Sequence, residues 1–378
     1  MTMNLLELDA LIKPYKIYAE VLEQGAIDQF KSYLEKDWVV QGALMPDAHT
    51  GYGLAIGGVV ACKDVVSPQA VGYDGGCGML AIPTSFNVDD IRAFSKDIFE
   101  GIYSAIPTGF NHNAEPTVCT SLNGLDRTGV IDTLITGGAF KQLGSLGSGN
   151  HFIEIGVDEE GTSWIVLHSG SRKVGHSVAE HYMKIAANSD RPLEGCYGID
   201  ANSKDGKDYI TDLKFCLEFA LANRKEMAHR IEQVIAKYAK GEADFSKLIN
   251  RNHNHAELKD GLWIHRKGAT HAEKDMMGVI PGNMRDGSFI VKGKGNPESL
   301  FSSSHGAGRV MGRNQARKNL SMETFKAEMK ANGIQAKVTE GTLDESAGAY
   351  KDVFEVMALQ SDLVEVLHHI KPLINIKS

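Results

Sequence analysis

Strand-like and helix-like segments follow one another irregularly along this chain of 378 residues. The strand-like segments are short, often β-branched and turn-rich at their ends; they cover residues 54–62, 78–83, 151–156, 164–168, 262–266 and 288–292. Helical spacing of apolar residues predicts helices over residues 23–36, 175–188, 208–240, 322–332 and 350–368. Because these segments do not repeat as a regular βαβ unit, the sequence favours an α+β fold with mixed sheets and surrounding helices.

The composition indicates one globular catalytic domain over residues 1–378. Hydrophobic residues make up 42% of the chain, which is enough for a large core, and no linker or repeat divides it. No apolar run reaches membrane-spanning length, and the first thirty residues lack a continuous apolar signal region. The five cysteines are scattered without a CxxC pair, which argues against a disulfide framework. We therefore expect a cytoplasmic protein with no membrane partner.

The formal net charge of −8 excludes a protein that coats nucleic acid non-specifically, because such binding depends on neutralising phosphates. Any contact with nucleic acid has to use local basic residues. Arg172, Arg309 and Arg313 lie in or beside glycine-rich segments, where they can hold phosphate groups. For Arg317 and Lys318, a solvated helix face is an equally good interpretation.

Side chains that prefer metal ions lie in segments rich in Gly, Ser and Asn rather than in apolar periodic segments; they are Cys77, His151, His168, His253 and His305. Asp74 precedes Cys77 by three residues, and the glycines between them allow both side chains to converge on one ion. Sulfur with imidazole and carboxylate suits Mn, Fe, Co or Zn better than Mg or Ca. Each residue alone also fits a structural role, but their number favours a metal-dependent active site that handles phosphate.

His305 lies in the segment SSSHGAGRVMGR, with serines before it and glycines after it. Arg309 and Arg313 follow four residues apart, on one face if a helix starts there. The histidine suits a further metal ligand. It also suits a nucleophile that attacks phosphorus while the arginines neutralise the developing charge. The K-x-D-G signature of nucleotidyltransferases with a lysine nucleophile is absent from the chain.

Ten ordered motifs resemble those of the RtcB family of RNA-splicing ligases, from about residue 45 to the C-terminus. They are MPDAHTGYG, IGGVV, VGYDGGCGM, LGSLGSGNHFIEI, LHSGSR, HNHA, RKGAT, VIPG, HGAGRVMGR and AYKD. The resemblance implies an enzyme that joins an RNA 3′-phosphate, or a 2′,3′-cyclic phosphate after its opening, to a 5′-hydroxyl. It also implies GTP and two Mn²⁺ ions as cofactors, with an archease-like activator as a candidate partner.

The resemblance further implies a role for each site residue. His305 is expected to become guanylylated, with Cys77 and Asp74 as further catalytic residues. Cys77 is expected to be shared by two Mn²⁺ ions, of which one is completed by His151 and His168 and the other by Asp74 and His253. The implied nucleotide contacts are Asn150, Glu154, Asn283, Ser288, His305, Gly306, Ala307, Gly308 and Lys351. The residues implied to hold RNA or nucleotide phosphates are Arg172, Arg309 and Arg313.

The chain departs from the family pattern at two places. Where the family commonly reads PGSMG, this chain reads PGNMRDG, so Asn283 replaces a serine while Arg285 and Asp286 add charge. The segment between the cysteine motif and LGSLGSGNH is also short. These differences suggest a divergent bacterial-type branch that serves RNA repair, including repair of cleaved ribosomal RNA, rather than tRNA splicing.

Two other functions compete with ligation. A manganese phosphoesterase or nucleotidyltransferase would keep the site and open cyclic phosphates without joining ends. A non-catalytic RNA-binding protein would use the metal site only for structure. A structural site is normally closed by four ligands and has no need of a further histidine beside arginines, which weighs against the second alternative.

Overall fold

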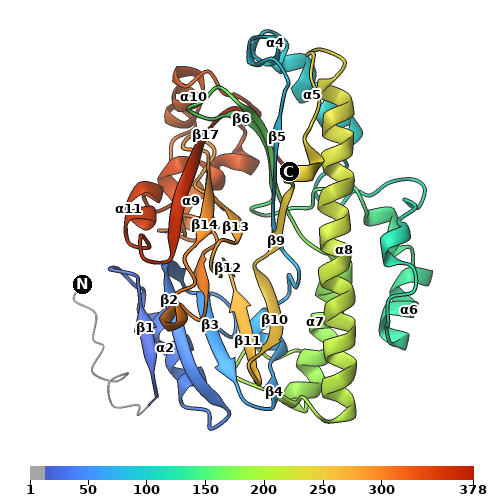
Figure 1. The fold of residues 1–378 in the computed structure, drawn as a ribbon, viewed down its shortest axis with the longest axis vertical. Coiled ribbons are helices and arrows are strands. Elements are labelled where there is room, and N and C mark those ends of the chain that lie inside the picture. The colour runs from blue at the N-terminus through green and yellow to red at the C-terminus, as the bar shows by residue number, and fades with distance from the viewer. Residues whose placement is uncertain (1–12) are drawn as a thin grey trace.

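The structure, a computed structural model of the chain, describes residues 13–378. The first twelve residues of the domain predicted over 1–378 therefore lie outside the described residues. Two β-sheets form the centre of the molecule, and helices cover them (Figure 1). This mixture of helices and sheets confirms the α+β prediction.

A five-stranded sheet combines strands from the N-terminal part and the middle of the chain. Its order is β1 (Tyr15–Ile17), β2 (Val39–His49), β3 (Ile56–Cys62), β11 (Leu262–Lys267) and β10 (Asn254–Lys259). Helix α2 (Gln24–Leu34) packs on this sheet with Phe30 and Leu34, which are fully buried. Burial of this apolar helix face fixes the helix against β2, whose C-terminal end enters the candidate site.

A larger sheet of eight strands carries most of the candidate site residues. Its order is β13 (Met277–Pro281), β14 (Ser288–Gly293), β17 (Val364–Lys377), β6 (Phe152–Val157), β7 (Ser163–Ser169), β5 (Gly78–Thr84) and β9 (Ile249–Asn252), and β16 (Gln335–Ala336) pairs with β17. Strands β6, β7, β5 and β9 are successive antiparallel neighbours. The starts of β6 and β5 therefore lie at the same sheet edge as the ends of β7 and β9.

The 32-residue helix α8 (Lys204–Ile235) runs along one side of the molecule and covers the larger sheet (Figure 1). Its residues Met227 and Ile231 are fully buried in one core cluster with Leu80 and Ile165 of the sheet. Helices α5 (Ser95–Ala105) and α7 (Arg172–Ala187) pack beside α8. The apolar spacing along this helix therefore serves core packing, as the sequence predicts.

Shorter elements complete the described part of the chain. The helices are α3 (Pro68–Val71), α4 (Val88–Ala93), α6 (Gly129–Thr136), α9 (Arg313–Asn319), α10 (Met322–Ala331) and α11 (Val353–Ala358). Two-stranded pairs are formed by β4 (Val65–Val66) with β8 (Ile199–Asp200), and by β12 (Ala269–His271) with β15 (Ser302–Ser304). Within residues 13–378, no helix is both long enough and apolar enough to cross a membrane.

The prediction of a helix over residues 350–368 is wrong. Helix α11 ends at Ala358, a turn follows, and β17 begins at Val364. This strand pairs with β14 on one side and with β6 on the other, so both of its edges form hydrogen bonds inside the sheet. Its β-branched residues Ile370 and Ile374 are fully buried. Tertiary pairing of a β-branched segment therefore outweighs its helical spacing.

Candidate active site

Four predicted metal ligands meet at one edge of the larger sheet. Cys77 directly precedes β5, His151 directly precedes β6, His168 is the penultimate residue of β7, and His253 directly follows β9. The antiparallel register places His168 opposite both Met79 of β5 and Phe152 of β6. The alternating strand directions thus bring four sequence-distant segments together, and all four side chains are buried.

The ligand atoms of this cluster lie at short distances from one another. Cys77 Sγ is 3.0 Å from His168 Nε2 and 3.4 Å from His151 Nε2. His168 Nε2 is 3.2 Å from His253 Nε2, and Asp74 Oδ2 is 3.2 Å from His151 Nε2. The atoms of Cys77, His151 and His168 all lie within 4.8 Å of one another, which is close enough to hold one metal ion.

The hydrogen bonds behind the rings favour cation binding. His151 Nδ1 lies 2.9 Å from the carbonyl oxygen of Leu146, and His168 Nδ1 lies 3.3 Å from that of Asn150. A carbonyl can only accept, so the Nδ1 atom of His168 carries the proton and its Nε2 atom presents a lone pair to the Cys77 sulfur. An imidazole lone pair, a sulfur and the Asp74 carboxylate that converge in this way suit a cation.

Burial acts on the protonation of the same groups. It lowers the pKa values of His168 and His253 well below the usual histidine range, so both rings are neutral ligands. Burial, followed by the negative charge of Asp74, raises the pKa of the Cys77 thiol well above its ordinary value. A metal cation would favour the thiolate form of Cys77, and the mixed sulfur, imidazole and carboxylate donor set suits such a cation.

Asp74 and His253 contact different histidines of the cluster. Asp74 lies beside His151, whereas His253 lies beside His168. The family resemblance implied that His151 and His168 complete one ion and that Asp74 and His253 complete the other. Both sets include a close contact to Cys77 or to a neighbouring ligand, since Cys77, His151 and His168 lie within 4.8 Å of one another.

Two buried polar residues of α8 support the ligand-bearing segments. Arg224 donates hydrogen bonds to the carbonyl oxygens of Gly76 and Ser169, which adjoin Cys77 and His168. Asn223 accepts hydrogen bonds from the backbone N–H groups of Gly144 and Ser145. Sequence reasoning missed both residues. Their polar character inside an otherwise apolar helix face is the signal that would have revealed them.

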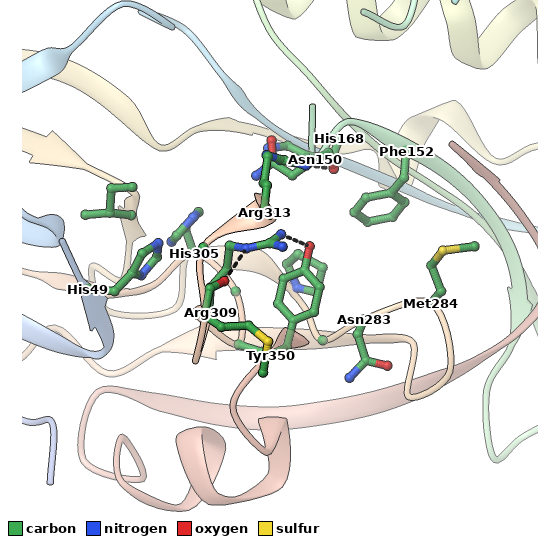
Figure 2. A pocket seen from close by; sticks show the side chains of 18 of the residues that line it. His49, Asn150, Phe152, His168, Asn283, Met284, His305, Arg309, Arg313 and Tyr350 are labelled. Carbon is green, nitrogen blue, oxygen red and sulfur yellow. Dashed lines mark hydrogen bonds between the residues drawn. The ribbon is translucent and has the colours of Figure 1, made fainter. Parts of the chain in front are cut away.

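A first cavity of about 620 Å³ opens beside His168 (Figure 2). Its walls include many of the residues predicted to bind nucleotide or phosphate: Asn150, Glu154, Asn283, His305, Gly306, Ala307, Gly308, Arg309 and Arg313. The volume lies within the range of about 300–1,000 Å³ that is usual for small-molecule sites. The cavity is large enough for a nucleotide.

His305 is held in one orientation by Asp47. Its Nδ1 lies 2.7 Å from Asp47 Oδ2, and the same oxygen accepts hydrogen bonds from the backbone N–H groups of His305 and Gly306. The proton is therefore on Nδ1, and the lone pair of Nε2 is available. The ring also packs edge-to-face on His253 with 4.9 Å between centroids. Asp47, in the segment MPDAHTGYG, was not among the predicted site residues.

A glycine is required immediately after this histidine segment. Gly308 has a positive φ of 75°, and a Cβ atom there would lie only 2.3 Å from the carbonyl oxygen of Asp47. Any larger residue would push the HGAG loop away from Asp47. The glycines of this segment thus allow His305 to approach its carboxylate partner.

Two predicted nucleotide contacts lie outside the walls of the first cavity. The Lys351 ammonium donates hydrogen bonds to the carbonyl oxygens of Pro46 and Ala48, on either side of Asp47. Ser288 is fully buried beside the Glu154 carboxyl. Lys351 therefore fixes the segment that carries Asp47, and Ser288 lies behind a cavity residue.

Side chains of the PGNMRDG loop form hydrogen bonds to the backbone and side chains of the same loop. Asn283 Oδ1 accepts hydrogen bonds from the backbone N–H groups of Arg285 and Asp286, and Asn283 Nδ2 donates to Asp286 Oδ2. Arg285 forms an ion pair of 2.7 Å with Asp286. Asn283 still lines the first cavity, but its amide group stabilises the turn.

The two arginines after His305 converge on an acidic pair. Arg313 Nη1 lies 2.6 Å from both Asp344 Oδ2 and Glu345 Oε1, and Arg309 Nη1 lies 3.3 Å from Glu345 Oε1. Helix α9 begins at Arg313, so Arg309 lies outside it and the two arginines do not share a helix face. Lys377 also binds Glu345, at 2.6 Å. Arg309, Arg313 and Lys377 line the first cavity, and their positive charges are paired with the carboxylates of Asp344 and Glu345, which are not among the cavity residues.

A second cavity of about 1,030 Å³ borders the metal-ligand cluster of Asp74, Cys77, His151, His168 and His253. Asp74 and His151 line it together with Arg172, whose guanidinium donates hydrogen bonds to Ser145 Oγ and to the carbonyl oxygen of Gly109. The neighbouring residue Asn150 lines the first cavity instead. Successive residues of this segment therefore line different cavities.

Comparisons with known proteins identify the family of this chain. The family model described as "tRNA-splicing ligase RtcB" matches residues 29–130 and 122–378. The chain is 34% identical over 367 residues to "RNA-splicing ligase RtcB" of Escherichia coli (strain K12), with 89% of each chain covered. It is 29% identical to "tRNA-splicing ligase RtcB" of Archaeoglobus fulgidus, with 92% of this chain and 88% of the relative covered.

These matches show that the chain belongs to the RtcB family. It is an RNA ligase, and its substrates are RNA.

Proposed function

We propose that this enzyme joins RNA 3′-phosphate or 2′,3′-cyclic phosphate ends to 5′-hydroxyl ends, using GTP, Mn²⁺ and a covalent histidine–GMP intermediate. The observation that carries the proposal is the position of His305. It lies in the wall of the first cavity, its Nδ1 is held by Asp47, and its ring contacts the metal-ligand residue His253. The proposed setting is cytoplasmic RNA repair or tRNA splicing, and the five free cysteines suit a reducing compartment.

In the first step, His305 Nε2 attacks the α-phosphorus of GTP. A nitrogen–phosphorus bond forms, the bond from that phosphorus to the β-phosphate bridging oxygen breaks, and pyrophosphate leaves with the electron pair. The imidazole keeps its proton on Nδ1 and becomes positively charged. Asp47 Oδ2, at 2.7 Å, stabilises that charge and holds the ring in the attacking orientation.

The residues of the first cavity orient the nucleotide. The backbone N–H groups of the glycine-rich segment Gly306–Gly308 suit phosphate oxygens, and Arg309 and Arg313 add positive charge on the same wall. Asn150 and Glu154 offer polar groups for the guanine base and ribose. Lys351 contributes through the Asp47 segment, since its ammonium lies behind that segment.

The metal-ligand cluster fits the proposed cofactor. Two Mn²⁺ ions, when bound, neutralise phosphate charge and align the reacting oxygens. The Cys77 sulfur would be shared by both, with His151 and His168 completing one and Asp74 and His253 completing the other. Arg224 stabilises the segments that carry Cys77 and His168, because it donates hydrogen bonds to the carbonyl oxygens of Gly76 and Ser169.

The later steps use the same residues. The RNA 3′-phosphate oxygen attacks the phosphorus of histidine-bound GMP, the nitrogen–phosphorus bond breaks, and His305 is regenerated. The RNA 5′-hydroxyl then attacks the activated 3′-phosphate and releases GMP. A 2′,3′-cyclic phosphate is first hydrolysed to the 3′-phosphate by water in the same site.

The test is incubation with α-labelled GTP and Mn²⁺, followed by RNA with 3′-phosphate and 5′-hydroxyl ends. Wild-type protein is expected to become labelled and to discharge the label into ligated product, whereas His305→Ala and Cys77→Ala remain unlabelled. His229→Ala is the matched control, because His229 is a partly exposed residue of α8 that lies outside both cavities. Cyclic-phosphate opening without protein labelling would replace this proposal with a metal-dependent phosphoesterase.

A further inference from the structure

Phe110 is an aromatic residue with almost no protein contacts on a well-supported loop. Its exposed fraction is 96%, and it lines the second cavity. The backbone beside it is held in place, because Gly109 N donates a 2.8 Å hydrogen bond to the carbonyl oxygen of Gly147 and the Gly109 carbonyl accepts one of 2.7 Å from Arg172. Exposure of a phenyl ring on a fixed backbone leaves apolar surface in water, and packing does not account for it.

The rest of the second cavity suits a nucleic-acid strand. Lys141, Arg172 and Lys173 line it, and Asp74 is the acidic side chain among its described lining residues. This basic wall contrasts with the net charge of −8 for the whole chain. On the wall near the cluster, Tyr73 stacks on His176 with 5.2 Å between ring centroids. Cations that track phosphates and aromatic faces that stack on bases are the two elements of single-strand binding.

The residues that border the second cavity indicate which of the two RNA strands it holds. His168 lines the first cavity, Asp74 and His151 line the second, and Cys77 Sγ lies within 3.4 Å of both histidines. In the sealing step GMP leaves toward the first cavity, where the nucleotide binds. Phosphoryl transfer places the attacking oxygen roughly in line with the leaving oxygen, on the opposite side of phosphorus. The second cavity borders the cluster through residues that the first cavity does not share, so it suits the approach of the 5′-hydroxyl.

We infer that the second cavity binds the RNA strand that carries the 5′-hydroxyl, and that Phe110 stacks on its terminal base. This inference rests on the proposed ligase function. The 5′-oxygen forms a bond to the 3′-terminal phosphorus, the bond from that phosphorus to GMP breaks, GMP leaves with the electron pair, and the hydroxyl proton passes to water. Arg172 and Lys173 contact phosphates of the incoming strand. Phe110 positions the strand without contacting the reacting atoms.

The experiment measures sealing with saturating GTP, Mn²⁺ and 3′-phosphate RNA while the concentration of the 5′-hydroxyl strand varies. Phe110→Ala is expected to raise the half-saturating concentration of that strand by roughly five- to 150-fold, the factor that corresponds to about 1–3 kcal/mol of stacking. Phe110→Tyr keeps the wild-type value. Val118→Ala is the matched control, because Val118 is 88% exposed but lies outside the cavity. Labelling of His305 by GTP is unchanged in all variants.

A 5′-hydroxyl RNA whose terminal nucleotide lacks its base tests the stacking directly. When the 5′-terminal nucleotide lacks its base, wild type and Phe110→Ala are expected to seal it with equal half-saturating concentrations. Equal values with the complete strand would overturn the inference. So would a Phe110→Ala defect confined to GMP transfer onto the 3′-phosphate strand, because the cavity would then hold that strand instead.

Direct binding separates failure of this inference from failure of the proposed function. Fluorescence anisotropy of a labelled 5′-hydroxyl oligoribonucleotide is measured with Mn²⁺ and without GTP. Weaker binding by Phe110→Ala supports the inference even if wild-type protein is never guanylylated, and equal binding by both proteins overturns it even if guanylylation is normal.

Discussion

Replacement of Asp47 by asparagine tests how the nucleophile is prepared. The asparagine side chain has nearly the same size, and its amide oxygen could still accept hydrogen bonds from the backbone N–H groups of His305 and Gly306. The substitution would remove the negative charge that lies 2.7 Å from His305 Nδ1. The geometry of the loop should therefore survive while the electrostatic contribution disappears.

The expected reduction in guanylylation rate follows from the charge that develops on His305 during that step. Attack by Nε2 makes the imidazole ring cationic, at a charge separation of about 4 Å from the carboxylate. With an effective dielectric constant of about 20, this attraction amounts to about 4 kcal/mol. Since 1.36 kcal/mol corresponds to a tenfold change in rate, Asp47→Asn should slow guanylylation by about 10³-fold. Asp47 is fully buried, so solvent screening of this pair is small.

Single-turnover labelling with α-labelled GTP gives the rate constant, and urea unfolding gives the stability. Asp212→Asn is the matched control: Asp212 is also fully buried and accepts three hydrogen bonds from Thr128 and Tyr182, but it lies outside both cavities. We expect Asp212→Asn to change stability and leave the labelling rate near that of wild type. A wild-type rate in Asp47→Asn, or an equal loss of rate in the control, would refute the electrostatic role of Asp47.

Three further predictions concern the metal cluster, the acidic pair and a buried carboxyl. Removal of divalent cations by a chelator should lower the midpoint of thermal unfolding, because a cation that binds only the folded cluster stabilises the folded state; Mn²⁺ should restore the midpoint, and a midpoint indifferent to Mn²⁺ would argue against a metal site. Glu345→Gln should lower the free energy of unfolding by about 3–5 kcal/mol in urea titrations, because buried Lys377 loses its partner at 2.6 Å. Burial raises the pKa of Glu154 from 4.5 to about 8, so the folded protein favours the protonated carboxyl. As pH rises from 4.5 to 8 the unfolded chain loses this proton while the folded protein keeps it, and the folded state becomes less stable relative to the unfolded state. Between pH 5 and pH 8 the free energy of unfolding of the wild type should therefore fall by an amount on the order of 3 kcal/mol, and in Glu154→Gln this fall should be absent. The same dependence of unfolding free energy on pH in both proteins would contradict the prediction.

The clustering of Cys77 and the histidines was predictable from sequence because their residue types are unusual for their surroundings. Cys77 and the histidines lie in polar, glycine-rich segments beside short apolar strands, and the structure places each of them at a strand end. Which of these side chains contact one another was not predictable. It depends on the order of β6, β7, β5 and β9 in the sheet, which no local pattern specifies.

Other features depend on contacts between distant segments. Asp47 meets His305 across a separation of 258 residues, and its own segment shows only that an acidic residue follows a proline. Arg224 stands out as a basic residue on an apolar helix face, but its carbonyl partners belong to distant segments and are not specified locally. Lys351 matches a family motif, yet its ammonium binds the backbone on either side of Asp47 rather than the cavity. Motif matching identifies the residue type, and only the packing identifies its partner.

The backbone of His253 explains how the nucleophile and the metal ligands stay in register. This residue alone separates β9 of the larger sheet from β10 of the five-stranded sheet. Its N–H donates a 2.7 Å hydrogen bond to the carbonyl oxygen of Cys77, and its own carbonyl accepts one of 3.2 Å from Ala269. Ala269 pairs in turn with Ser304, the residue before His305. A continuous series of backbone contacts thus joins Cys77 to His305, the proposed nucleophile, so main-chain hydrogen bonds help to set the distance between them. The two sheets can therefore supply different parts of one active site without a flexible connection between them.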